Sequence, residues 1–111
     1  IKTMLEENLE RTFACNPMKQ MGGYVKRCVG ISVKMRIENS KGHRIQQLFI
    51  GNEPMKIDEI YKVAFVTEQG VPKQVGINRM DLAVKAVDAM AEYLNKNPVY
   101  KTAPFQTFSL V

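Results

Sequence analysis

The sequence has few of the residues from which hydrolytic and metal centres are built. It contains one histidine, His43, and two cysteines, Cys15 and Cys28. Because His43 is the only histidine and lies in a predicted turn, we expect neither a histidine metal cluster nor a Ser/His/Asp triad within this chain. The cysteines form no C-x-x-C motif and have no partner pair for zinc. They are either two free thiols, which we favour, or one disulfide.

Other absences exclude further classes of protein. Neither the G-x-x-x-x-G-K-[ST] nor the G-x-G-x-x-G phosphate-binding loop occurs. The chain also lacks an apolar run of about 18 residues, so we predict no membrane span. The formal net charge is +5, but the lysines and arginines are scattered along the chain. This distribution favours a solvated surface over one that binds a nucleic acid polymer.

The length of 111 residues and the hydrophobic content of 45% suit one compact domain. We therefore expect a single domain over residues 1–111. Ile1 lies inside a helical pattern with no capping residue before it. This start predicts that the chain is part of a longer protein.

The longest alternation of apolar and polar residues runs from Ile31 to Glu38 and predicts a strand with one buried face. Residues 39–43 have turn composition and lead into a second strand over residues 44–50, which indicates an antiparallel hairpin. The β-branched and aromatic stretch 60–66 predicts a third, central strand. The tail 105–111 is β-prone and predicts an edge strand.

Two stretches have helical spacing. Residues 1–14 predict an amphipathic helix that ends before Asn16-Pro17. A second amphipathic helix is expected over residues 79–96, with Asn78 as its N-cap. The predicted fold is therefore α+β, with a mixed or antiparallel sheet from residues 24–66 and both helices packed on its apolar side. The loop of residues 67–79 is long enough to suggest a functional role.

The order of several short motifs resembles the C-terminal domain of the 5'-nucleotidase family. The motifs are Leu5-Glu6-Glu7-Asn8-Leu9, Met21-Gly22-Gly23-Tyr24, Gly42-His43-Arg44-Ile45, Gly51-Asn52-Glu53-Pro54-Met55 and Tyr61-Lys62-Val63-Ala64. Two stretches look closest to the SoxB-type thiosulfohydrolases within that family, namely residues 7–23 and residues 61–72. The family's N-G-G-x-R loop, which would precede Ile1, is not in this chain.

The resemblance implies a two-domain, periplasmic or extracellular hydrolase. A separate N-terminal metallophosphoesterase domain of the same parent would bind two divalent metals such as Mn or Zn, while this chain binds the substrate. No cofactor and no catalytic residue are expected in this chain, which alone should be inactive. The substrate would be a small phosphorylated or sulfur-containing molecule. The alternative is a non-catalytic domain that docks a carrier protein.

Five residues are the candidate substrate-binding set: Tyr24, Lys26, Arg27, Glu68 and Gln69. Tyr24 offers a flat ring that could cover a ligand, although it could equally pack against the first helix. Lys26 and Arg27 suit a phosphate, a sulfate or an acidic peptide. Glu68 and Gln69 lie where the resembling nucleotidases carry an aromatic ring, which favours a non-nucleotide substrate.

Overall fold

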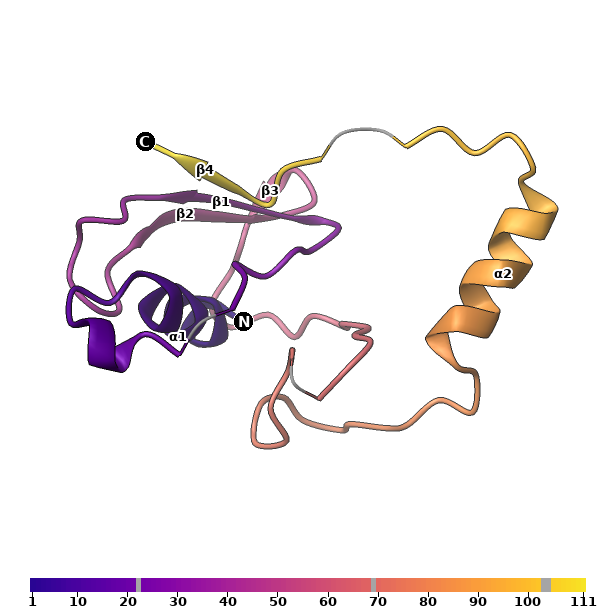
Figure 1. Ribbon diagram of the computed structural model, residues 1–111, viewed down its shortest axis with the longest axis horizontal. Helices are drawn as coiled ribbons and strands as arrows, with labels where there is room; N and C mark the ends of the chain where they lie inside the picture. Colours follow the sequence, from indigo (N-terminus) through magenta and orange to yellow (C-terminus); the bar gives the residue numbers. More distant parts are fainter. Residues whose placement is uncertain (22, 69, 103–104) are drawn as a thin grey trace. The chain divides into compact units, whose positions relative to one another are not determined.

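The computed structural model describes residues 1–21, 23–68, 70–102 and 105–111 (Figure 1). These residues form an α+β structure with two α-helices and a four-stranded mixed sheet. The chain divides into two compact units, Ile1–Lys62 with Phe105–Val111 and Val63–Pro104. The single domain expected over residues 1–111 stays a prediction.

The first helix, α1, spans Lys2–Phe13 and confirms the expected amphipathic helix. Its buried face is formed by Leu5 and Leu9, which are completely inaccessible. The helix ends because Ala14 has an extended backbone with ψ of 133°. Just beyond it, Asn16 caps the short 3-10 helix η1, Pro17–Lys19, by accepting a hydrogen bond from the Met18 N–H.

The sheet contains β1 (Ile31–Met35), β2 (Ile45–Ile50), β3 (Glu53–Pro54) and β4 (Phe108–Leu110) in the order β3-β2-β1-β4. β1 and β2 pair antiparallel, which confirms the hairpin, and β2 pairs antiparallel with β3. A bulge between Lys34 and Met35 shifts their register by one residue of β2. β4 pairs parallel with β1 at the edge of the sheet, as expected for the tail.

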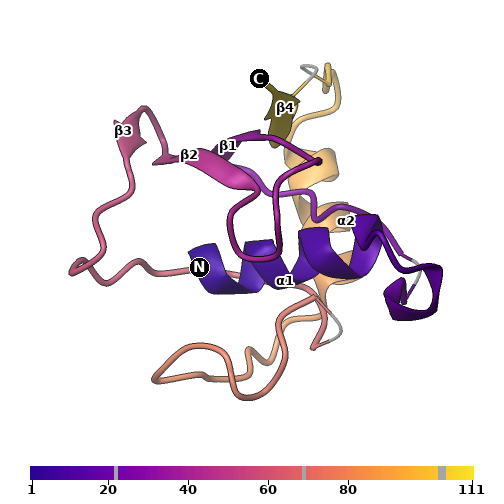
Figure 2. The same cartoon turned by 90° about the vertical axis from the view of Figure 1, so that its left-hand side faces the viewer.

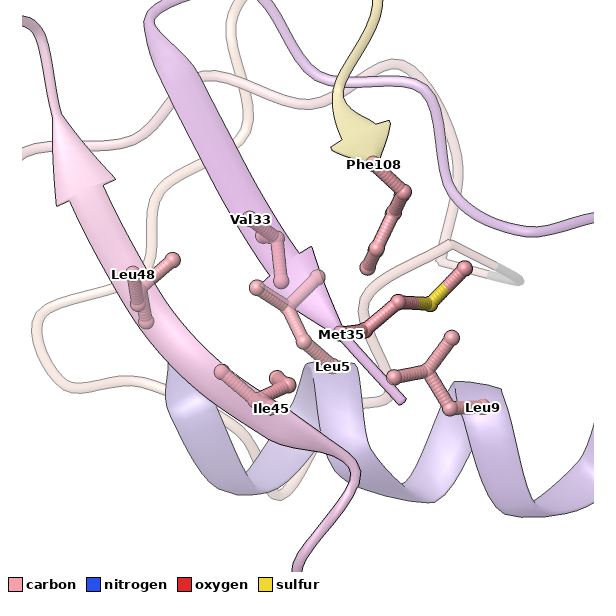
Figure 3. Close-up of a cluster of buried hydrophobic side chains, with 7 residues drawn as sticks. All are labelled: Leu5, Leu9, Val33, Met35, Ile45, Leu48 and Phe108. Atoms are coloured by element: carbon pink, nitrogen blue, oxygen red, sulfur yellow. The ribbon is translucent and has the colours of Figure 1, made fainter. Parts of the chain in front are cut away.

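The hydrophobic core lies between α1 and one face of this sheet. Figures 1 and 2 both show α1 beneath the β1–β2 hairpin. The alternation predicted for the first strand is confirmed over Ile31–Met35, where Val33 and Met35 are buried while Ser32 and Lys34 are exposed. The predicted extension of this strand to Glu38 is wrong, because the chain turns at residues 37 and 38. Figure 3 shows the side chains that meet in this core: Leu5, Leu9, Val33, Met35, Ile45, Leu48 and Phe108.

Arg44 ties the hairpin to α1 through a buried polar network and is only 2% exposed. Its guanidinium forms an ion pair with Glu10 and donates to the carbonyls of Ile37 (2.9 Å) and Phe13 (3.3 Å). The Phe13 carbonyl is one of those that a helix end leaves without an intrahelical partner. A single side chain therefore joins the end of α1 to the turn between β1 and β2.

Glu6 completes this network from the preceding turn of α1. Its two carboxylate oxygens accept hydrogen bonds from the backbone N–H groups of Arg44 (3.2 Å) and Ile45 (2.7 Å). The carboxylate is buried, and the cost of its desolvation is offset by these two donors. The start of β2 is thereby fixed on the helix.

The strand predicted over residues 60–66 is wrong, because the structure has no strand there. The β-prone composition of this stretch is not matched by a neighbouring strand, and β-propensity largely reflects packing against such a neighbour. The Tyr61 hydroxyl instead accepts a hydrogen bond from the Lys56 N–H (2.9 Å). The Arg79 guanidinium lies over the Phe65 ring, with its central carbon 4.7 Å from the ring centroid. The sheet is thus built from residues 31–54 and 108–110 in place of 24–66.

The second helix, α2, spans Ala86–Lys96, so the expected start at residue 79 is wrong. Asn78 adopts a left-handed φ of 52° and is not its N-cap, which is Lys85. The Arg79 side chain is engaged with the preceding loop instead of with a helix. The expected end is confirmed, because Asn97 closes α2 just before Pro98. Its packing on the sheet stays a prediction.

Replacing Met35 by aspartate should unfold the first unit. Met35 is 6% exposed in the core, and an unpaired buried carboxylate costs several kcal/mol, against a total stability of about 5–15 kcal/mol for a small domain. The matched control is Ser32→Asp, which adds the same charge on the exposed face of the same strand. Thermal unfolding followed by circular dichroism tests this, and equal melting of the two variants would refute the packing.

The ion pair of Glu10 predicts a loss of stability in acid. The hydrogen bond from Arg44 holds the pKa of Glu10 below its ordinary value, against the opposing effect of burial. Because the folded pKa is lowered, its contribution is present above the unfolded pKa and is lost as the pH falls through the folded value. Glu10→Gln should therefore be less stable than the wild type at neutral pH and should lose less stability on acidification.

Urea unfolding from about pH 7 to about pH 2 measures this difference. Glu7→Gln is the control, because Glu7 is an exposed residue of the same helix. Acid curves of equal slope for Glu10→Gln and the wild type would show that the ion pair does not contribute.

Candidate functional site

The predicted site residues fall into both units of the structure. Tyr24, Lys26 and Arg27 lie in the first unit, in the segment between η1 and β1. Glu68 lies in the second unit, and Gln69, like Gly22, lies outside the described residues. The structure therefore brings together the first three residues and describes Glu68 separately.

Tyr24 is 89% exposed. The alternative in which this ring packs against the first helix is therefore wrong. An aromatic ring presented to solvent on a segment without regular secondary structure is available to cover a ligand.

The backbone around Tyr24 is nevertheless held firmly by Asn8 of α1. The Asn8 Nδ2 donates to the Tyr24 carbonyl (3.1 Å), and the Lys26 N–H donates to Asn8 Oδ1 (2.8 Å). One amide side chain thus satisfies two peptide groups, as a neighbouring strand would. The Tyr24 ring is therefore exposed, while the backbone that carries it is held by two hydrogen bonds from Asn8.

Thr107 holds the other end of the same segment. Its hydroxyl accepts from the Cys28 N–H (2.8 Å) and donates to the Cys28 carbonyl (3.0 Å), and the residue is 6% exposed. Val25 and Cys28 add packing against the core. Residues 24–28 are therefore fastened by side chains from α1 and from the residue before β4.

The local charge of this segment is positive. Lys26 is half-buried and Arg27 is exposed. Within the part of the chain that the structure describes, neither residue forms an ion pair. Two cations without a protein carboxylate, within three residues of an exposed ring, favour an anionic ligand.

The cysteines do not form a disulfide in the structure, with Cys15 exposed and Cys28 half-buried. Burial raises the pKa of the Cys28 thiol, an effect that the charge of Lys26 opposes. The thiol therefore stays protonated at neutral pH and is a poor nucleophile.

In the second unit, Glu68 forms an exposed ion pair with Lys73 (3.6 Å). The loop after it is held by Arg79, whose guanidinium donates to the carbonyls of Val71 (3.1 Å), Pro72 (2.7 Å) and Val75 (2.8 Å). The loop predicted to be functional is thus shaped by its own arginine, which was expected to begin a helix.

Among the described residues, no group of three or more His, Cys, Asp or Glu side chains is placed to hold a metal ion. His43, the single histidine, lies exposed in the turn between β1 and β2. No helix within the described ranges has the length and apolar character needed to cross a membrane.

Comparison of the chain with protein-family models and with curated proteins found no match.

Sequence reasoning did not select Asn8 or Thr107 as site residues. A signal was present for Asn8, because asparagine is a poor helix former and here occupies the middle of an amphipathic helix next to Leu9. No comparable signal existed for Thr107, which contacts Cys28 across 79 residues of sequence.

Thr107→Val should destabilise the first unit by about 1–3 kcal/mol, because it removes both hydrogen bonds to Cys28 at nearly constant volume. The control is Thr102→Val at an exposed position. Urea unfolding monitored by circular dichroism provides the free energies. Identical unfolding midpoints for Thr107→Val and the wild type would contradict the role of Thr107.

Proposed function

We propose that this chain is the substrate-binding part of a 5'-nucleotidase-like hydrolase that acts on a small anionic substrate. The observation that carries the proposal is the exposed Tyr24 ring, held on a fixed backbone beside Lys26 and Arg27. The two metals and the hydrolytic step belong, in this proposal, to a separate N-terminal domain of a larger parent protein. This chain binds the substrate and determines the substrate specificity.

Contacts between the motifs that carry the resemblance support the proposal. Asn8 of the helical motif binds the backbone at Tyr24, in the motif led by glycines. Arg44, in the hairpin motif, is bound by Glu6 and Glu10 of α1. These three motifs, which lie apart in the sequence, are therefore packed within the first unit, as is expected if they mark a common fold. The motif of residues 61–64 lies across the boundary between the two units.

The chemistry of the segment 24–27 suits a phosphate or a sulfate group. A lysine and an arginine supply charge-assisted hydrogen bonds to the oxygens of such a group, and a tyrosine ring can cover an apolar part of the same molecule while its hydroxyl donates one hydrogen bond. These are binding and orienting roles. No proton transfer or bond cleavage is assigned to this chain.

A non-nucleotide substrate is favoured because Glu68 replaces an aromatic ring that the resembling nucleotidases use for stacking. Its carboxylate has a counter-ion in Lys73, 3.6 Å away, and both side chains are exposed. Such a pair offers polar contacts but no flat apolar surface for a purine. A sulfur oxyacid attached to a small carrier group therefore suits these proposed binding residues better than a nucleotide does.

The test uses the full-length parent protein with two probes, adenosine monophosphate and cysteine S-sulfonate. Tyr24→Ala and Glu68→Ala should each change the ratio of kcat/KM for the two probes by about threefold to tenfold, as expected for one aromatic or polar contact. Metal content, measured by atomic emission, should not change.

Thr102→Val is the control variant, because Thr102 is exposed and outside the proposed site. Efficient hydrolysis of adenosine monophosphate that is insensitive to both substitutions would overturn the proposal. Hydrolysis of cysteine S-sulfonate only when it is part of a folded carrier protein would point to the docking alternative.

A further inference from the structure

Asn8 is an unusual residue for its position. It lies half-buried in α1, one residue before the fully buried Leu9, where its helix propensity is poor compared with alanine. Its own backbone carbonyl is engaged as well, since it accepts a hydrogen bond from the Thr12 hydroxyl (2.9 Å). The side chain contributes little to the helix and makes its hydrogen bonds elsewhere.

The Asn8 side chain makes two hydrogen bonds, and both are to the segment that carries Tyr24. The Nδ2 group donates to the Tyr24 carbonyl at 3.1 Å and Oδ1 accepts from the Lys26 N–H at 2.8 Å. These two peptide groups flank Val25, so binding both of them fixes the backbone on each side of that residue. The direction in which the Tyr24 side chain leaves the chain is fixed with it.

Few side chains can make this pair of contacts. A primary amide carries a donor and an acceptor, aspartate has no donor when ionised, and alanine has neither. Glutamine has both groups but is longer by one methylene. Its amide would therefore be displaced from the position at which it can bind both the Tyr24 carbonyl and the Lys26 N–H. The spacing therefore selects asparagine.

We propose that Asn8 is a positioning residue for substrate binding, which acts by holding the backbone at residues 24–26 so that the Tyr24 ring keeps its binding orientation. This inference rests on the function proposed above, because it requires that Tyr24 meets the substrate. Asn8 itself does not touch the substrate. Its effect should therefore be expressed through Tyr24 and should appear in KM more than in kcat.

A double-mutant cycle in the full-length parent protein tests the inference with cysteine S-sulfonate as the probe. Asn8→Ala should raise KM about threefold to tenfold, the size expected for one neutral hydrogen bond, and should change kcat less than about twofold. Tyr24→Ala should raise KM by at least as much. The double variant should have the KM of Tyr24→Ala, because Asn8 has nothing left to position.

Hydrogen exchange of the Lys26 amide supplies a readout independent of activity. Asn8→Ala should lose protection at Lys26, whereas Asn8→Asp should keep it, because a carboxylate still accepts from that N–H. Asn8→Asp loses the donor to the Tyr24 carbonyl, so its KM should still rise. Glu7→Ala, at an exposed neighbour on the same helix, should match the wild type in both measurements.

The outcomes separate the two proposals. A KM unchanged in Tyr24→Ala overturns the proposed function and this inference with it. A KM raised in Tyr24→Ala but unchanged in Asn8→Ala, or raised independently in the double variant, overturns this inference alone. If Asn8→Ala does not fold, Asn8→Asp provides the KM comparison, because it also lacks the donor to the Tyr24 carbonyl.

Discussion

The attachment of the β1–β2 hairpin to α1 is the constraint on which the first unit depends. Arg44 reaches two carbonyls and the Glu10 carboxylate, while Glu6 binds the backbone of Arg44 and Ile45. Buried charges of this kind are costly when one partner is lost, so the network resists any other placement of the helix. The apolar contacts of Leu5 and Leu9 with the sheet stabilise the unit, and the polar network determines where α1 lies along the hairpin.

The candidate site inherits its geometry from this attachment. α1 is fixed on the sheet, Asn8 is fixed on α1, and the segment 24–26 is fixed on Asn8. Thr107, the residue that precedes β4, is hydrogen-bonded to Cys28, and β4 pairs with β1. The segment 24–28 has no regular secondary structure, but each of its ends is hydrogen-bonded to the core unit, through Asn8 and through Thr107.

Two of the elements that were predicted correctly are set by local periodicity. The amphipathic pattern of α1 and the alternation in β1 each predict which residues are buried, and these residues pack against one another in the core. Ile60–Val66 has the composition of a strand but no strand beside it, and residues 79–85 have helical spacing while Arg79 bonds to its own loop. Asn8 and Thr107 were missed for the related reason that their partners are set by tertiary structure.

A binding segment that is ordered before its ligand arrives has a thermodynamic advantage. Fixing the backbone of one residue costs about 1–2 kcal/mol, and a loop ordered only on binding would lose this from its affinity. In residues 24–28 the cost is offset during folding by the hydrogen bonds of Asn8 and Thr107 and by the packing of Val25 and Cys28. In the proposed function, the Tyr24 ring then loses only its side-chain freedom when it binds the substrate. In the proposed function, this is the advantage of an exposed Tyr24 on a segment that is held by Asn8 of α1 and by Thr107, the residue before β4.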